Sequence, residues 1–243
     1  MDLGIGGRRA AVAAASQGLG RAAAVALAAE GVQVAMCSRS RERIEEAAAG
    51  IPGAVPLVAD VGTAEGAAQF VRDARAALGG IDILLANGGG PPPGTFATTD
   101  LDAYVPAFEQ NCFAVIAMCK EAVPPMQEQG WGRVVAITSV SVRQPIPTLI
   151  LSNAARAGVT GFLKTLAREV AADGVTVNSL QPGSHDTERI RALRGGGSAG
   201  AGGDRIGDPA DFGRVAAFLC SEHVAFLTGA AIHVDGGAFA GLQ

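Results

Sequence analysis

Short runs of apolar residues alternate along the chain with longer segments in which apolar residues recur at helical spacing. Seven runs are apolar almost throughout, and each predicts a β-strand: residues 10–15, 32–37, 54–59, 81–86, 132–139, 174–180 and 230–234. Six helices are expected between them, beginning near Leu19, Arg41, Ala64, Leu101, Leu149 and Pro209. Strands that are apolar on both faces need helices on both sides of a parallel sheet. The pattern therefore predicts one doubly wound α/β domain of Rossmann type over residues 1–243, with a parallel seven-stranded sheet.

Composition and charge restrict the ligand to a small molecule. The chain carries 19 Lys and Arg against 23 Asp and Glu, a formal net charge of −4, and 49% of its residues are hydrophobic. Its basic residues form no stripe interleaved with aromatic side chains, which argues against binding to nucleic acid or to an anionic membrane. No apolar run approaches the roughly 20 residues of a membrane helix, and the run after Arg9 is too short for a signal peptide. We expect a cytoplasmic protein.

The four cysteines are expected to be buried thiols. Cys37, Cys112, Cys119 and Cys220 are widely spaced, without a C-x-x-C pair or a partnered His cluster. Zinc sites need such groupings. We therefore expect no bound metal.

Glycines and polar residues directly follow six of the expected strands. In a parallel sheet the strands end at one edge, and ligands bind there. Any one of these residues alone would suit a turn or a helix cap, but together they predict a nucleotide site formed by Gly18 and Gly20, Ser38 and Arg39, Asp60, Asn87 to Gly90, Ser139, and Pro182 with Gly183.

The first strand end predicts a pyrophosphate site. Gly18 and Gly20 allow the backbone to approach phosphate groups, and the helix that begins there presents N–H groups without partners inside the helix. The G-x-G spacing alone is a weak signal, but its position between a strand and an Ala-rich helix strengthens it.

The second and third strand ends concern the ribose and the adenine. Arg39, with Arg41 and Arg43 nearby, stands where a carboxylate would bind the ribose of NAD. An Arg suits the 2′-phosphate, so NADP is expected and NAD is less favoured; the alternative is that these arginines form a solvated helix start. Asp60 is expected either to accept a hydrogen bond from the adenine amino group or to cap the next helix.

Taken together, the motifs resemble those of the short-chain dehydrogenase/reductase superfamily over nearly the whole chain, in a divergent branch similar to 3-oxoacyl-carrier-protein reductases. The family's T-G-x-x-x-G-x-G motif corresponds to residues 13–20, with Ala14 in place of the first Gly, and N-N-A-G corresponds to residues 86–89. The later P-G-x-x-x-T motif ends at Thr187. The resemblance implies cofactor contacts from Ser16, Gln17, Gly18, Leu19, Gly20, Ser38, Arg39, Asp60, Val61, Asn87, Gly88, Gly89, Arg156, Pro182, Gly183 and Thr187.

The catalytic motif departs from the family pattern. Where the family has Y-x-x-x-K, this chain has Ser152 and Arg156. In family members the Tyr gives a proton to the carbonyl oxygen and the Lys lowers its pKa; the resemblance assigns Ser139 to orienting the carbonyl and Asn111 to holding a water. Ser152 is less acidic than Tyr, whose pKa is about 10, and its side chain is shorter. Arg156 keeps the charge but cannot shuttle a proton.

Further residues around the catalytic motif are candidates for proton transfer and for contact with the substrate. His185 is considered as a replacement acid, since an unperturbed His titrates near 6.5; a loop His facing solvent is the plainer alternative. His223 and His233 are expected to be structural. Around the cleft, the substrate is expected to meet Ser141, Arg143 and Gln144, with Arg143 as a candidate for binding an anion.

A flexible lid is expected at about residues 195–203, which contain only Gly, Ala and Ser. The resemblance also implies a homo-oligomer, a tetramer or a dimer.

The motifs leave three hypotheses on function. The chain is an NADP-dependent reductase that converts a carbonyl to an alcohol, or the reverse, with an altered proton relay; or it is a catalytically impaired cofactor-binding partner; or it binds no cofactor, because Ala14 adds a methyl group beside the pyrophosphate.

Overall fold

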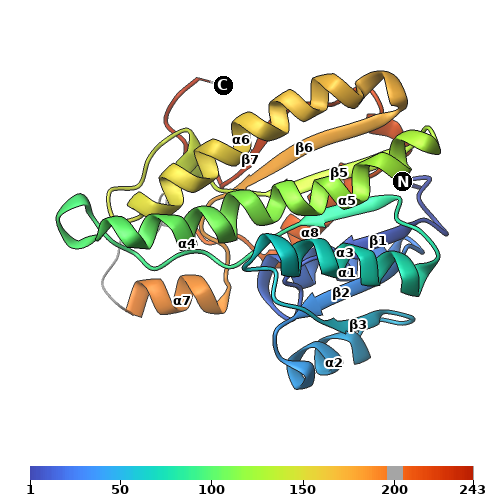
Figure 1. Ribbon diagram of the computed structural model, residues 1–243, viewed down its shortest axis with the longest axis horizontal. Helices are drawn as coiled ribbons and strands as arrows, with labels where there is room; N and C mark the ends of the chain where they lie inside the picture. Colours follow the sequence, from blue (N-terminus) through green and yellow to red (C-terminus); the bar gives the residue numbers. More distant parts are fainter. Residues whose placement is uncertain (196–204, 243) are drawn as a thin grey trace.

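Seven strands form one parallel sheet in the order β3-β2-β1-β4-β5-β6-β7 (Figure 1). The computed structural model describes residues 1–195 and 205–242. The chain builds the sheet outward from β1 in one direction and from β4 in the other, so the strand order reverses between these two. The predicted fold class is confirmed. The strands are β1 (Arg9–Val12), β2 (Gln33–Ser38), β3 (Val55–Val58), β4 (Ile83–Ala86), β5 (Gly132–Ile137), β6 (Val175–Pro182) and β7 (Ala231–Val234).

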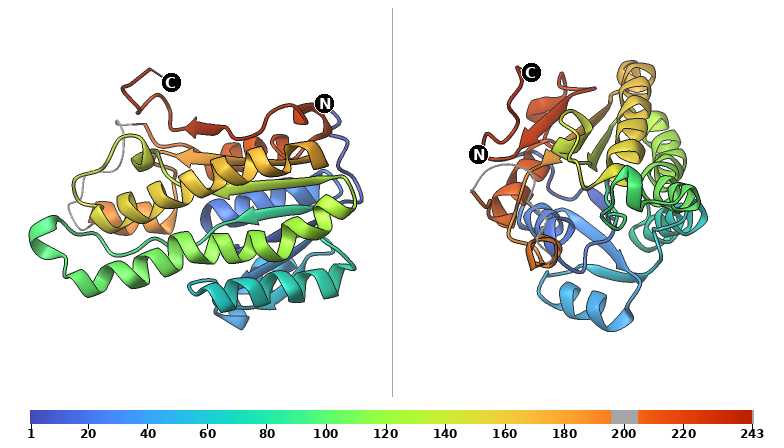
Figure 2. Two further views of the ribbon diagram at one scale, coloured as in Figure 1. Left: turned by 45° about the horizontal axis from the view of Figure 1, so that its top comes forward. Right: turned by 90° about the vertical axis from the view of Figure 1, so that its left-hand side faces the viewer.

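Helices cover both faces of the sheet (Figure 2). The core on one face includes Phe70, Met118 and Leu163; the core on the other includes Leu27 and Phe212. The first face is covered by α3 (Ala64–Leu78), α5 (Ala114–Glu128) and α6 (Ile150–Val170), and the second by α1 (Gly18–Ala29), α2 (Arg41–Ala49) and α8 (Pro209–Phe218). None of the helices in the described residues is both long and apolar enough to cross a membrane.

Five of the six predicted helix starts lie within one residue of the observed ones. The exception is the segment expected near Leu101, which begins with a 3₁₀ turn, continues as α4 (Tyr104–Phe108), widens into a π-helical turn at Glu109–Phe113 and only then becomes α5. A further helix, α7 (Glu188–Gly195), was not predicted. The glycine-rich lid predicted at about 195–203 lies, beyond Gly195, outside the described residues.

The prediction of buried thiols is confirmed for all four cysteines. Burial raises the pKa of Cys119 and of Cys220 to about 12. Cys37, at the end of β2, shifts to about the same pKa, mainly through burial. Thiols with such pKa values stay protonated at neutral pH and behave as small apolar side chains.

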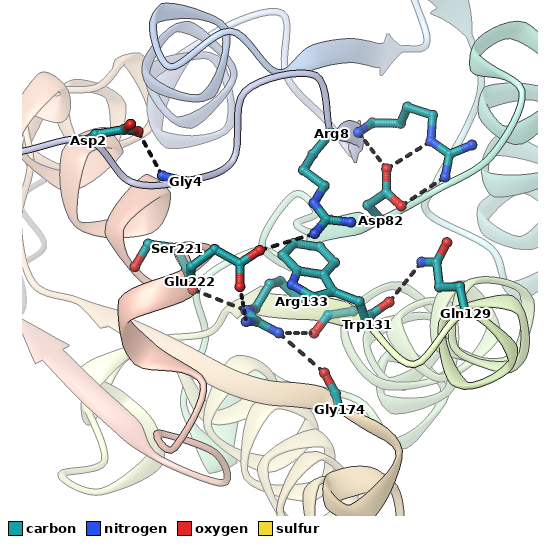
Figure 3. A network of polar contacts seen from close by, with 12 residues as sticks. Asp2, Gly4, Arg8, Asp82, Gln129, Trp131, Arg133, Gly174, Ser221 and Glu222 are labelled. Atoms are coloured by element: carbon teal, nitrogen blue, oxygen red, sulfur yellow. Dashed lines mark hydrogen bonds and ion pairs between the residues drawn. The ribbon is translucent and has the colours of Figure 1, made fainter.

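A charged network closes the amino-terminal edge of the sheet, opposite the strand ends that carry the motifs (Figure 3). The Trp131 ring lies between two guanidinium groups, with Arg8 at 3.8 Å and Arg133 at 4.3 Å from the ring centroid. Arg133 is almost fully buried and donates to the carbonyls of Ser221, Gly132 and Gly174. These bonds and the aromatic face offset the cost of burying its charge.

Next to this cluster, Arg9 and Asp82 join the starts of β1 and β4. The Arg9 guanidinium donates to both carboxylate oxygens of Asp82 at 2.8 Å, and the Arg9 backbone N–H donates to one of them at 2.8 Å. Burial alone would raise the pKa of Asp82, but the hydrogen bonds and the charge of Arg9 outweigh it and hold that pKa below its ordinary value. Asp82 therefore stabilises the fold as an anion.

We expect Asp82→Asn to lower the free energy of unfolding by about 2 kcal/mol at pH 7, because it leaves a partly buried guanidinium without its partner. A group with a depressed folded-state pKa contributes stability that is present above its unfolded pKa, about 3.9 for Asp, and is lost as the pH falls through the folded value. Urea unfolding from pH 7 to pH 3 measures the difference in the free energy of unfolding between the unmodified chain and Asp82→Asn, which should shrink as the pH falls.

The control is Glu45→Gln, which removes an exposed ion pair to Arg41 and should cost less than about 0.5 kcal/mol. A loss for Asp82→Asn that stayed constant down to pH 3 would contradict the assignment of the stabilisation to the ionised carboxylate.

Candidate active site

A cavity of about 820 Å³ runs along the carboxyl ends of the strands, across the point where the strand order reverses between β1 and β4. Open parallel sheets bind ligands at this point. Two residues of the predicted site, Gly20 and Asn111, do not line the cavity. The remaining predicted residues do: Ser16, Gln17, Gly18, Leu19, Ser38, Arg39, Asp60, Val61, Asn87, Gly88, Gly89, Ser139, Ser152, Arg156, Pro182, Gly183 and Thr187.

The glycine turn after β1 is closely packed against the end of β4. Gly18 has a φ of 58°, and a Cβ atom on Gly20 would lie 2.6 Å from the carbonyl oxygen of Ala14 and 2.7 Å from the amide nitrogen of Asn87. Asn87 donates to that same carbonyl at 3.2 Å. Gly20 therefore allows α1 to pack closely against the strand ends, although it does not line the cavity; any larger residue would push the helix away.

Ala14 has the backbone conformation of the glycine that it replaces. Its φ is 47°, and it is the one residue other than glycine with a positive φ in the described part of the chain. For an L-residue this left-handed conformation costs roughly 1–2 kcal/mol. Ala14 also lines the cavity, so its methyl group occupies space that a glycine would leave to a ligand.

Two of the three candidate arginines line the cavity. Arg39 and Arg43 do so while remaining exposed, whereas Arg41 lies outside and pairs with Glu45 at 3.3 Å. The binding of a 2′-phosphate by Arg39 stays a prediction. Ser40, not an arginine, caps α2, and its side chain accepts from the N–H of Arg43.

Asp60 follows β3 and lines the cavity next to the glycine of the following turn. One of its carboxylate oxygens accepts from the N–H of Gly62 at 2.9 Å. The alternative that Asp60 caps the next helix is wrong, because Thr63 is the N-cap of α3 and accepts from the N–H of Gly66. Asp60 belongs to the wall of the cavity.

The predicted catalytic residues meet at the other end. Ser139 follows β5, and its Oγ accepts from the N–H of Ser141 at 3.1 Å, which leaves its O–H able to donate. Ser152 lies in the first turn of α6 and is 6% exposed. Arg156, one turn further, donates to the carbonyls of Ile137 at 3.0 Å and Thr138 at 3.2 Å.

These two bonds tie α6 to the strand that carries Ser139. Burial, and after it the charge of Arg189, lower the pKa of Arg156 to about 10. At neutral pH the guanidinium remains a cation. Arg156 thus places a fixed positive charge beside Ser139 and Ser152, and it holds the helix that carries Ser152.

Asn111 lies behind the cavity wall, in the π-helical turn. Its amide nitrogen donates to the carbonyl of Ala107 at 3.2 Å. Its Oδ1 is buried and accepts no hydrogen bond from the described residues. A buried acceptor in this situation suits a water molecule, which is the role that the family resemblance implies for it.

His185 lines the cavity and is buried, so the alternative of a loop His facing solvent is wrong. Its ring contacts Phe212 edge-on with centroids 5.3 Å apart, and Nδ1 lies 3.3 Å from the carbonyl of Gly183. Burial lowers the pKa of His185, which disfavours the protonated ring. Its role as a replacement acid stays a prediction.

The other two histidines have structural contacts. His223 lies 2.7 Å from the carbonyl of Asp2 through Nε2, and His233 stacks on Phe239 with centroids 4.5 Å apart.

The expected substrate contacts after Ser139 are wrong. None of Ser141, Arg143 and Gln144 lines the cavity: Ser141 is buried, Arg143 is exposed, and Gln144 accepts from the N–H of Ala240. A 3₁₀ turn at Val140–Val142 redirects the chain, so that the wall is formed five residues later by Ile146, Thr148 and Leu149.

Arg189 is a cavity residue that the sequence analysis missed. It lies in α7, two residues after Thr187, and donates to the carbonyls of Gly90 and Pro91 at 3.1 Å each. It lines the cavity together with Ile190. The position of Arg189, two residues after the P-G-x-x-x-T motif, places it near the cavity in the sequence. A predicted helix at α7 would have been needed to show that its side chain faces the cavity, and no helix was predicted there.

Comparisons with known proteins agree with this geometry. Residues 13–238 match the family model described as enoyl-(acyl carrier protein) reductase. The chain is similar to dehydrogenase/reductase SDR family member 4 of Bos taurus, with 31% identity over 96% of this chain and 88% of that protein. It is also similar to the 3-oxoacyl-[acyl-carrier-protein] reductase FabG of Salmonella typhimurium, with 32% identity over 96% of this chain and 98% of that protein.

Two solved structures have the same fold over almost all of both chains. L-sorbose reductase from Gluconobacter frateurii, complexed with NADPH and L-sorbose, superposes with a TM-score of 0.91 at 29% identity and covers 100% of each chain. YwfH, an NADPH-dependent reductase involved in bacilysin biosynthesis, superposes with a TM-score of 0.91 at 25% identity, over 97% of this chain and 100% of that one.

We expect Ala14→Gly to raise the free energy of unfolding by about 1 kcal/mol, because it removes the cost of the left-handed conformation. The matched control is Ala13→Gly, one residue earlier in ordinary backbone and fully buried, which should lower stability by a similar amount. Urea unfolding of both variants measures the two signs. A loss of stability in both would contradict the strain assigned to Ala14.

Proposed function

The chain belongs to the short-chain dehydrogenase/reductase family, and from this premise we propose that it is an NADP-dependent reductase of a carbonyl compound, such as a 3-oxoacyl thioester, with an altered proton relay. The observation that carries the proposal is that one cavity is lined both by Arg39 and Arg43 and by Ser139, Ser152 and Arg156. The 3-oxoacyl thioester is proposed because the FabG relative is named a 3-oxoacyl-[acyl-carrier-protein] reductase.

The residues of the cavity fit NADP. Arg39 and Arg43 supply the cations that a 2′-phosphate needs. The N-terminal turn of α1 supplies backbone N–H groups for the pyrophosphate. Thr187 lies close to this turn, since a Cβ atom built on Gly18 would be 3.5 Å from the Thr187 methyl group. L-sorbose reductase is described as complexed with NADPH and YwfH as NADPH-dependent, which agrees with NADP; a hydroxysteroid dehydrogenase with a similar structure is complexed with NADH.

The altered relay is derived from the side chains at the catalytic end. A bound nicotinamide cofactor supplies the hydride in reactions of this kind. Ser139 donates a hydrogen bond to the carbonyl oxygen, and Arg156 stabilises the negative charge that develops on it. Since Ser152 is a weak acid and burial disfavours the protonated form of His185, we propose that a water held by Ser139 and Ser152 delivers the proton. Without a positioned acid the rate falls by roughly 10² to 10⁴.

The second candidate function is a cofactor-binding partner that does not turn over substrate. It is favoured by the position of Ser152, a small hydroxyl at the place of the family's acid, and by the lowered pKa of His185, the histidine that lines the described cavity. The two candidates share the cofactor and differ in turnover.

We also propose that the chain forms a homo-oligomer, a dimer or a tetramer. Val105 is 71% exposed and Phe113 is 45% exposed, both on the helical segment that leads into α5. Large apolar side chains on one exposed segment are suited to an interface between subunits.

The cofactor assignment predicts a preference that depends on Arg39. Arg39→Ala should raise the Kd for NADPH by about tenfold or more and leave the Kd for NADH unchanged, because only NADPH carries the phosphate. Calorimetric titration with both nucleotides measures this. Arg41→Ala, outside the cavity, is the control and should change neither value. If the unmodified chain binds neither nucleotide, the third hypothesis, exclusion by Ala14, is favoured.

The relay predicts that Ser139→Ala lowers kcat/KM for NADPH-dependent reduction by about a hundredfold, the loss typical of one donor to a developing oxyanion. The assay is NADPH oxidation with an acetoacetyl thioester and a panel of ketones. Ser141→Ala, a buried serine two residues away that does not line the cavity, should retain full activity. NADPH binding with no turnover of any substrate by the unmodified chain would favour the second candidate.

A further inference from the structure

Two arginines from different helices face the same end of the cavity. Arg156 reaches it from α6 and Arg189 from α7. They reach the ends of neighbouring strands, since Arg156 bonds to Ile137 of β5, Arg189 bonds to Gly90 beyond the end of β4, and β4 lies beside β5 in the sheet. Two cations held near each other repel, and an anion placed between them would relieve that repulsion.

Neither guanidinium has a carboxylate partner among the described residues. Arg156 bonds to the carbonyls of Ile137 and Thr138, and Arg189 to those of Gly90 and Pro91. Neutral carbonyls orient a guanidinium without cancelling its charge. Each group has five N–H donors, and these bonds account for two on each, so both side chains keep donors for a ligand.

The pair lies at the substrate end of the cavity, away from Arg39 and Arg43. Arg156 is one helical turn from Ser152, and Arg189 lies over Gly90, which follows Asn87 to Gly89 at the end of β4. A Cβ atom on Gly90 would overlap the Arg189 guanidinium, so the glycine allows this close contact. The acidic residues that line the cavity are Asp60, at the adenine end, and Glu188, which forms no ion pair with either arginine.

We propose that the substrate is a keto acid, whose carboxylate is bound by Arg189 with support from the charge of Arg156. The planar guanidinium matches a carboxylate with two parallel hydrogen bonds. The inference rests on the proposed reductase function and names its substrate class. Hydride from NADPH adds to the keto carbon, and the π electron pair moves to the oxygen, which then takes a proton from water. NADPH becomes NADP⁺, and the keto acid becomes a hydroxy acid with its carboxylate unchanged.

The test compares keto acids with their methyl esters, which have the same carbonyl but no charge. The series varies the distance between the keto carbonyl and the carboxylate by using pyruvate, 3-oxobutanoate, 4-oxopentanoate and the methyl ester of each. For at least one chain length we expect kcat/KM for the acid to exceed that for the ester by about tenfold or more, the effect of a hydrogen bond to a charged group. The acid-to-ester ratio should fall to about one in Arg189→Met and recover in part in Arg189→Lys.

The control variant is Arg191→Met, on the same helix. Arg191 pairs with Asp186 at 2.7 Å and lines a neighbouring cavity of about 740 Å³ between α1 and α8, whereas it does not line the candidate active site. Its removal changes the charge of α7 by the same amount as Arg189→Met does. The acid-to-ester ratio should therefore be unchanged in Arg191→Met.

Calorimetric titration of the same acids and esters into the protein saturated with NADP⁺ gives a second readout that does not need turnover. Preferential binding of an acid, lost in Arg189→Met, supports the inference even if no compound is reduced, in which case the proposed reductase function fails alone. Equal binding and equal reduction of acid and ester overturn the inference and leave the reductase intact. A weaker affinity for NADPH in Arg189→Met with an unchanged acid-to-ester ratio also overturns it, since Arg189 would then serve the cofactor.

Discussion

The sheet is buried on both faces, and this constraint decides where polar chemistry is possible. A strand covered by helices on each side has no place for an unpaired polar side chain, so such groups collect at the two ends of the strands. At the amino-terminal edge they neutralise one another, as Arg9 does with Asp82. At the carboxyl edge some do, as Arg191 does with Asp186, but Arg39 and Arg156 line the cavity with no carboxylate partner among the described residues. These two arginines can therefore offer their charge to a ligand.

The exchange of Lys for Arg in the catalytic motif changes what that position contributes. An ammonium group is a compact point charge, whereas a guanidinium is a planar fork with five donors that match a carboxylate or several carbonyls at once. Arg156 uses part of that fork on the carbonyls of Ile137 and Thr138. The position has thereby become an anchor between α6 and β5 that also carries a fixed charge. A relay that passes protons through this residue is no longer available.

The sequence predicted the parts of the site that depend on strand ends, because an apolar run fixes where a buried strand stops and therefore which residue follows it. Arg39, Asp60 and Ser139 were located in this way. It did not predict parts that depend on packing between distant segments. His185 is turned inward by Phe212 of α8, and the substrate wall shifts from residues 141–144 to 146–149 because of a 3₁₀ turn. The helix of Arg189 was missed because its eight residues precede a glycine run that obscures any periodicity.

The missing Tyr and the pair of arginines both affect how the negative charge on the carbonyl oxygen is stabilised during hydride addition. Hydride addition to a carbonyl leaves a negative charge on oxygen, and an active site can meet it with a proton or with a fixed positive charge. The second route needs no group with a pKa near neutrality; it needs cations held in place before the reaction, in a site with little water. Carbonyl oxygens of the chain hold both guanidinium groups in this way. In the proposed reaction electrostatic stabilisation comes first and protonation from water follows, so loss of the acid reduces the rate without removing the means of stabilising the alkoxide.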